Sequence, residues 1–218
     1  MTTQSKGWKS IIIPDGLIVF ISGVPGMGKT TISYELLKNY SKFRIVEETD
    51  LIRETLRGYN DYLRIKFANQ VSFIFDNITI TDHKKLLTFE EAKLQCEIMK
   101  HSLTQIVARQ QRKGIATIIN GVHIVPEVLA DIIKSPKTIF INLYVTSQHE
   151  IYKRIFGRDA TSYMLENLPL IFQTNAALQL STENIMKQYH NVYNVNVTSL
   201  SIEETVNQII DCIQLFQL

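Results

Sequence analysis

One stretch near the start of the 218-residue chain constrains its fold more than any other: Gly23-Val-Pro-Gly-Met-Gly-Lys-Thr30. It follows the apolar run from Leu17 to Ser22 and opens a helical-looking segment, Thr31 to Tyr40. Glycines let a backbone fold closely around an anion, and the free amide groups at a helix start donate hydrogen bonds to it. In a strand–loop–helix context this spacing predicts a phosphate-binding loop. The alternative, a glycine-rich turn that binds nothing, is disfavoured by that context.

Each part of the loop has an expected task in holding a nucleoside triphosphate, with ATP as the default. Lys29 reaches the β- and γ-phosphates and is a candidate catalytic residue, while the hydroxyl of Thr30 is placed to ligate Mg²⁺. Pro25 lacks an N–H group, so it stiffens the loop without donating. The predicted nucleotide-binding residues are Gly23, Val24, Pro25, Gly26, Met27, Gly28, Lys29, Thr30 and Thr31.

The composition fits one globular domain whose main partner is a small molecule. Hydrophobic residues make up 45% of the chain and charged residues 20%, which is ordinary for such a domain. The formal net charge of +2 gives no reason to expect nucleic acid as the main partner. Cys96 and Cys212 lie far apart without metal-ligand spacing, which favours buried thiols over a disulfide or a zinc site.

The N-terminal region carries no convincing targeting signal. Apolar residues begin at Ile11, but Pro14, Asp15 and Gly16 cut the stretch short. It is therefore neither a membrane-spanning helix nor a typical signal peptide. We expect a cytoplasmic protein without membrane contact, either a monomer or a homodimer.

Apolar runs and helical patterns alternate along the chain, which predicts an α/β fold with a doubly wound, five-stranded parallel sheet. The predicted strands are residues 17–22, 43–47, 115–119, 138–145 and 192–197. The predicted helices are residues 29–40, 88–114, 126–133, 147–156 and 161–187, with two more beginning near residues 51 and 201. We predict a single domain over residues 1–218, with a helical lid at about 147–187 and a possible substrate-covering insert at about 58–87.

Two carboxylates follow the second predicted strand, at the sheet edge where parallel α/β proteins place their chemistry. Glu48 and Asp50 are two residues apart, so on an extended segment they would point to the same side, beside the phosphate loop. One carboxylate can hold Mg²⁺ while the other accepts the proton of an attacking hydroxyl. We expect Asp50 to be the base, with Glu48 nearer the metal, and both carboxylates are candidate Mg²⁺ ligands beside Thr30. Solvent-facing acids at a strand end are the alternative.

Arginines on both sides of the loop favour group transfer over simple binding. Arg154 and Arg158 are one helical turn apart after the fourth strand, where a lid can stabilise charge on a transferring phosphoryl group. Arg53 and Arg57 are also four residues apart and suit a carboxylate or phosphate on the acceptor. His123 is a further candidate for hydrogen bonding the acceptor, although a histidine satisfied within its own loop is an equal alternative.

Other classes of nucleotide-binding protein fit less well. The late Asn-Lys-x-Asp signature expected of GTPases is missing from the sequence. The third predicted strand ends at Asn120, whereas motor and transporter ATPases need a carboxylate pair there and a longer chain.

Taken together, these residues resemble the 2-phosphoglycerate kinase family of phosphate-loop (P-loop) kinases. The segments that carry the resemblance are G-V-P-G-M-G-K-T-T from Gly23, E-T-D-L-I-R-E-T-L-R from Glu48, G-V-H-I-V-P from Gly121, the R-x-x-x-R of Arg154 and Arg158, and N-V-T-S-L-S-I-E-E-T-V from Asn196. The loop is generic, whereas D-x-I-R-E and G-V-H-I-V-P together are more specific.

The resemblance implies ATP- and Mg²⁺-dependent phosphorylation of the free hydroxyl of 2-phosphoglycerate, and a fold of the P-loop kinase type. Two positions depart from the expected pattern. Asn120, a candidate acceptor contact, stands where the family is expected to carry glutamate, and Phe172 stands where an arginine is expected. The missing arginine indicates an acceptor less anionic than 2-phosphoglycerate, and Asn120 removes an expected acidic contact to the acceptor or metal. The alternatives are a nucleic-acid end kinase or nucleotide-sugar kinase, and an ATP-dependent switch protein.

Overall fold

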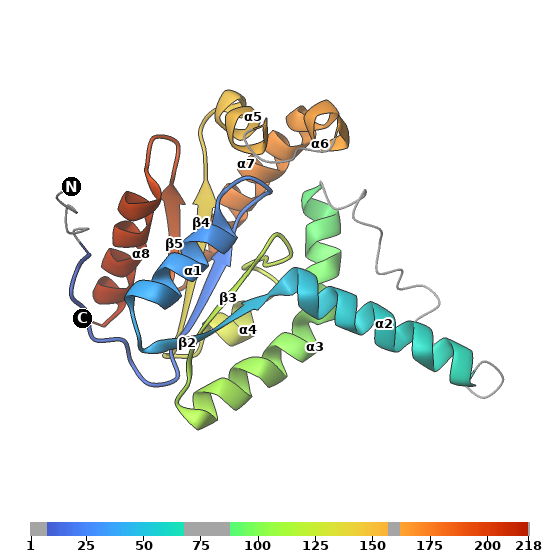
Figure 1. Cartoon of the computed structure of the whole chain (residues 1–218), viewed down its shortest axis with the longest axis horizontal. Helices are drawn as coiled ribbons and strands as arrows, with labels where there is room; N and C mark the ends of the chain where they lie inside the picture. The colour runs from blue at the N-terminus through green and yellow to red at the C-terminus, as the bar shows by residue number, and fades with distance from the viewer. Residues whose placement is uncertain (1–7, 68–87, 157–161, 218) are drawn as a thin grey trace, which may run out of the picture.

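The computed structural model describes residues 8–67, 88–156 and 162–217. The strands are β1 (Ile18–Ser22), β2 (Phe43–Glu48), β3 (Ala116–Gly121), β4 (Thr138–Tyr144) and β5 (Val192–Asn196). The helices are α1 (Lys29–Asn39), α2 (Thr49–Phe67), α3 (Phe89–Lys113), α4 (Ala130–Ile133), α5 (Gln148–Phe156), α6 (Ser162–Glu166), α7 (Leu168–Met186) and α8 (Ile202–Phe216). Figure 1 labels these elements along the chain.

The strands form one parallel sheet in the order β2-β3-β1-β4-β5, as predicted. Every residue of β1 is buried, because the strand is central and both faces of the sheet are covered. Ser22, the last residue of β1, pairs in register with Gly121 of β3 and Asn142 of β4. The phosphate loop therefore leaves the sheet at its centre, where the strand order reverses direction and doubly wound folds bind their ligands.

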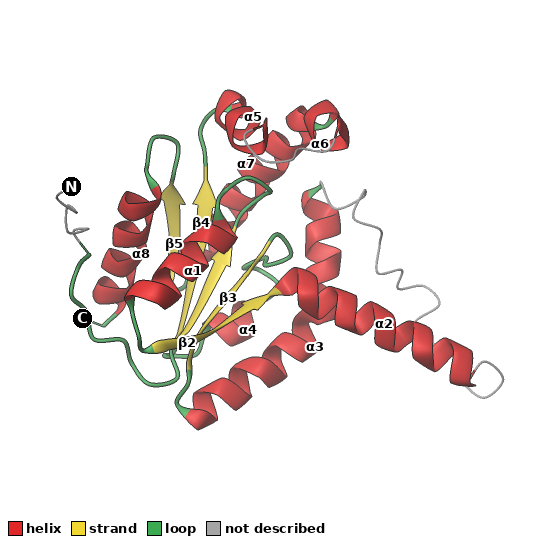
Figure 2. Cartoon of the chain, in the orientation of Figure 1, coloured by secondary structure: helices red, strands yellow, loops and turns green. Residues whose placement is uncertain are grey.

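Helices cover both faces of the sheet, as Figure 2 shows. Alternate residues of β1 feed two separate cores, because successive side chains of a strand point to opposite faces. Val19 and Ile21 belong to a core that includes residues of α1 and α8, whereas Ile18 and Phe20 pack with residues of α3 and α4. Helix α2 runs from the end of β2 away from the sheet (Figure 1).

The predicted ends of two helices are confirmed. The hydroxyl of Thr88 accepts a hydrogen bond from the amide of Glu91 at the start of α3, and Gly114 ends that helix in the left-handed conformation. Ser201 and Glu204 form a complete capping box at the start of α8. These local signals fix helix ends because they satisfy backbone groups that the helix itself leaves unpaired.

The predicted bounds of the strands and helices need three corrections. Strand β2 ends at Glu48 and α2 begins directly at Thr49, so no extended segment carries residue 50. The helix predicted at 126–133 is confined to α4, and the long one predicted at 161–187 is divided into α6 and α7. Proline in the first turn of α7 explains that division, since it cannot donate within a preceding helix but suits a helix start. Of the predicted insert, residues 68–87 lie outside the described residues.

Both cysteines are free and buried, as predicted. Burial raises the pKa of the Cys96 thiol to about 12, and burial does the same for the Cys212 thiol. Among the described helices, none combines the length and apolarity needed to cross a membrane.

Candidate active site

The phosphate loop connects β1 to α1, and Gly23 and Gly28 illustrate why it contains glycine. Gly23 has φ 144°, and a Cβ there would lie 2.7 Å from the backbone oxygen of Leu143. Gly28 has φ 82° and is the N-cap of α1 in the left-handed conformation. Side chains rarely adopt such φ values, so both positions need glycine. The loop consequently passes close to β4 and then turns into α1, and the start of a helix is a place where anions bind.

The side chain of Lys29 folds back onto the phosphate loop. Its Nζ donates to the backbone oxygen of Val24 at 3.0 Å, and the residue is 9% exposed. Thr30 is exposed, and Thr31 is half-buried. The ammonium group is therefore held against the loop, while Thr30 is open to solvent.

A cavity of about 200 Å³ opens beside the loop. Its walls come from the loop, α1, α5, the connection between β5 and α8, and the start of α8. They include Gly26, Thr31, Arg154, Leu200, Ile202 and Thr205. The Arg154 guanidinium donates to the backbone oxygen of Val197. Arg154, the first of the two predicted lid arginines, thus links α5 to the end of β5, whereas Arg158 lies outside the described residues.

The two candidate carboxylates do not lie side by side as predicted, and helix geometry is the reason. Glu48 ends β2 in register with Asn120 of β3, while Asp50 is in the first turn of α2. The side chain of Asp50 is 58% exposed, and its Oδ1 lies 3.6 Å from Nδ1 of His123. The premise of an extended segment is therefore wrong, because a helix turns each residue by about 100°.

The side chain of Asn120 lies on the face of the sheet that α1 covers. Its Nδ2 donates to the hydroxyl of Ser33 on α1 at 3.0 Å, and it is only 2% exposed. Because paired residues of parallel strands share a face of the sheet, Glu48 lies on the α1 side as well. Glu48 is thus on the side of the helix that Thr30 begins.

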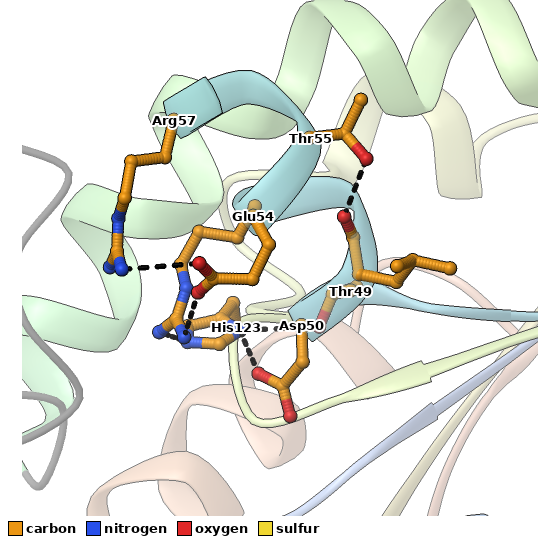
Figure 3. A network of polar contacts seen from close by, with 8 residues as sticks. Thr49, Asp50, Glu54, Thr55, Arg57 and His123 are labelled. Carbon is orange, nitrogen blue, oxygen red and sulfur yellow. Dashed lines mark hydrogen bonds and ion pairs between the residues drawn. The ribbon is translucent and has the colours of Figure 1, made fainter. Parts of the chain in front are cut away.

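His123 is fully buried. Figure 3 shows that its ring lies beside Asp50 and Glu54 of α2. Its Nε2 lies 3.3 Å from Nη1 of Arg53, and its Nδ1 lies 3.2 Å from the hydroxyl of Thr49. A guanidinium group has no acceptor, so Nε2 accepts from Arg53. Nδ1 then carries the proton of the neutral ring and faces Thr49 and Asp50. The predicted acceptor-binding histidine therefore links Arg53 to Asp50.

The predicted arginine pair, Arg53 and Arg57, already holds an internal anion. Nη2 of Arg53 donates to Oε1 of Glu54 at 3.0 Å, and Nη1 of Arg57 donates to Oε2 of Glu54 at 3.1 Å (Figure 3). The side chain of Arg53 is 1% exposed, that of Arg57 31% and that of Glu54 42%. Sequence reasoning did not single out Glu54, although its place between the two arginines was a visible signal.

Gly121 is a second residue that sequence reasoning left without a role. A Cβ at this position would lie 1.7 Å from the Thr49 hydroxyl and 2.9 Å from the Thr49 Cβ. The missing side chain lets the start of α2 pack directly against the end of β3. This close approach brings Thr49 within reach of His123.

Two polar side chains, Asn175 and Glu127, tie α7 to neighbouring elements, and neither had a sequence signal. Asn175 of α7 accepts from the backbone amide of Val145 at 3.2 Å and donates to its oxygen at 2.9 Å, which ties α7 to the chain that leaves β4 for α5. Glu127, after β3, accepts from Lys93 of α3 at 2.6 Å and from Ser181 of α7 at 2.8 Å. Burial alone would raise the pKa of the Glu127 carboxyl, but the bonds from Lys93 and Ser181 outweigh it and lower the pKa.

Comparisons with known proteins agree with this geometry. The chain is 27% identical over 222 residues to 2-phosphoglycerate kinase of Methanococcus maripaludis, covering 94% of this chain and 67% of the relative. Thymidylate kinase of Candida albicans aligns with a TM-score of 0.57 at 18% identity, over 94% of this chain and 93% of that one. Shikimate kinase of Bacteroides thetaiotaomicron aligns with a TM-score of 0.50 at 13% identity, over 91% and 98%. No protein-family model matches the chain.

The five-stranded parallel sheet, its phosphate loop and these structural neighbours define the P-loop kinase fold. Within that class, the sequence resembles 2-phosphoglycerate kinases over most of its length. Both the predicted fold class and the predicted resemblance are confirmed.

Proposed function

We propose that this protein is an ATP-dependent kinase that phosphorylates a hydroxyl group of a small, anionic acceptor similar to 2-phosphoglycerate. The observation that carries the proposal is the placement of Asp50, Arg53 and His123 at the sheet edge that also holds the phosphate loop. Similarity to 2-phosphoglycerate kinases over 94% of the chain supports the reaction class. We also propose a cytoplasmic location and a monomer or homodimer.

In this proposal the phosphate loop and the cavity beside it bind the nucleotide. When phosphates enter, the Lys29 ammonium exchanges the oxygen of Val24 for the β- and γ-phosphate oxygens. The adjoining cavity, with Leu200 and Ile202 on one wall and Arg154 on another, offers apolar contact and a planar cation to a nucleobase. In this arrangement Arg154 contributes to nucleotide binding, and its predicted part in catalysis requires release from Val197.

The donors near the loop fit Mg²⁺ bound chiefly through substrate. Thr30 offers an exposed hydroxyl, and Glu48 lies on the same side of the sheet, whereas Asp50 belongs to the acceptor side. Among the described residues no group of three or more His, Cys, Asp or Glu side chains forms a metal site. That pattern suits Mg²⁺, which keeps several waters and takes phosphate oxygens as ligands. When bound, Mg²⁺ neutralises charge on the phosphates.

Phosphoryl transfer then needs a base and an orienting group on the acceptor side. Asp50 accepts the proton of the acceptor hydroxyl while the hydroxyl oxygen bonds to the γ-phosphorus. ADP leaves with the bridging oxygen. His123 holds Arg53 in place from the buried side, so the guanidinium can fix the anionic end of the acceptor. Lys29 balances the charge that develops on the β-phosphate.

The test is acceptor-dependent ADP release by the purified protein. We expect at least one three-carbon hydroxy acid or its phosphate ester, 2-phosphoglycerate first among them, to raise ADP release well above the level without acceptor. Lys29→Ala should remove this activity while the fold remains, as shown by circular dichroism. If no acceptor raises ADP release above the Lys29→Ala level, the kinase proposal is refuted.

A further inference from the structure

Glu54 occupies the place between Arg53 and Arg57 that an acceptor anion would take. Its two carboxylate oxygens are divided between the two guanidinium groups, at 3.0 Å and 3.1 Å. The two arginines are one turn apart on α2, and thus on the same face of the helix. A phosphate or carboxylate bridging two arginines would use the same donors.

The three side chains differ in how firmly they are held. Arg53 is fully buried and its other terminal nitrogen contacts His123, so its position is set by the fold. Glu54 and Arg57 are partly exposed, at 42% and 31% of their side chains. A buried guanidinium needs an anionic partner, whereas an exposed ion pair contributes little and opens easily. The partner of Arg53 can therefore be exchanged, provided another anion replaces it.

The position of this anion site matches the needs of the proposed reaction. Asp50 lies one turn before Glu54 on α2, and His123 lies within 3.6 Å of Asp50 and 3.3 Å of Arg53. An anion held by the arginine pair would thus bind next to the candidate base (Figure 3). An acceptor with an anionic group a few bonds from its hydroxyl can reach both.

We propose that Glu54 is an internal substitute for the acceptor anion and that the acceptor binds by displacing it from Arg53 and Arg57. Glu54 thereby determines specificity: an acceptor must bring a carboxylate or phosphate to replace it, and a neutral analogue leaves the arginine pair closed. The identity of the ligand rests on the proposed kinase function. The exchange of Glu54 for another anion depends only on the side chains of α2.

The experiment compares phosphate binding in wild type and Glu54→Gln by calorimetry. Each protein is first titrated with Mg²⁺ and β,γ-imido ATP so that the phosphate loop is filled, and then with inorganic phosphate. Because the closed state of wild type reduces its apparent affinity, Glu54→Gln should bind phosphate about three- to tenfold more tightly. Arg57→Gln in the Glu54→Gln background should abolish the gain. Asp131→Asn, which removes an exposed carboxylate paired with Lys100, should leave phosphate affinity unchanged.

The outcomes separate this inference from the kinase proposal. Failure to bind the ATP analogue would count against the kinase function, whereas the phosphate step tests Glu54. Folded Glu54→Gln with unchanged or weaker phosphate binding would overturn the inference, as would a gain that persists without Arg57. Glu54→Ala provides a second variant at this partly exposed position. A crystal structure of wild type with phosphate should also show Glu54 turned away from both arginines; phosphate bound elsewhere with Glu54 in place would contradict the exchange.

Discussion

Replacing Gly121 by alanine should destabilise the protein through one identifiable clash. The new Cβ would lie 1.7 Å from the hydroxyl of Thr49, which side-chain rotation can relieve, and 2.9 Å from the Thr49 Cβ, which rotation cannot. The start of α2 must therefore move away from β3 by some tenths of an ångström. Forcing an extra methyl group into a packed site costs about 1–3 kcal/mol.

For a domain of this size, a loss of that magnitude lowers the melting temperature by about 2–12 °C. Urea unfolding followed by circular dichroism measures the free energy of unfolding, and Gly58→Ala is the matched control. Gly58 lies on α2, and a Cβ there would meet nothing within 4 Å, so alanine should be neutral or stabilise by about 0.5–1 kcal/mol.

A double-mutant cycle tests the mechanism of that loss. Thr49→Ala removes the hydroxyl but keeps the Cβ, so the double variant should recover part of the stability lost by Gly121→Ala. If Gly121→Ala is as stable as wild type, or if the two substitutions are strictly additive, the packing of α2 on β3 is not what constrains residue 121.

Two further predictions concern α7. Asn175→Ala removes both bonds to the backbone of Val145 and leaves buried groups unsatisfied, so the free energy of unfolding should fall by about 2–4 kcal/mol. The control Asn184→Ala, on an exposed face of the same helix, should change that free energy by less than about 0.5 kcal/mol. Equal urea midpoints for the two variants would contradict this prediction. Because the pKa of Glu127 is lower in the folded protein than its ordinary value of 4.5, its contribution to stability is present above that pH and is lost as pH falls through the folded pKa. Glu127→Gln should therefore lower the urea midpoint at pH 7 more than at pH 3, and an equal effect at both pH values would refute the linkage.

The sequence predicts the fold well because each strand and most helix ends carry local signals. The apolar run of β1, the glycines of the loop and the Ser201–Glu204 box leave little freedom in where elements begin. The division of α6 from α7 was missed because helical periodicity continues across the break. Proline in the first turn of α7 was the available signal.

The sequence predicted which residues form the candidate site better than it predicted the contacts between them. The phosphate loop, Asp50, Arg53 and His123 were all singled out, and the structure brings the last three together. What failed was the geometry of Glu48 and Asp50, since it depended on where β2 ends. The pairing of Glu54 with both arginines was not predicted: its place between them was a signal, but the sequence does not show how deeply the Arg53 side chain is buried.

The most direct test of the proposed function is to measure formation of the phosphate ester itself, by ³¹P NMR, with the acceptor that raises ADP release most. Wild type should convert ATP and acceptor to ADP and the ester in equal amounts. Asp50→Asn should lower kcat by about 10²–10⁴-fold, because it removes the base, while the Kd for ATP stays within about twofold. An ester formed at an undiminished rate by Asp50→Asn would contradict the assignment of the base, and no ester with any acceptor would contradict the kinase itself.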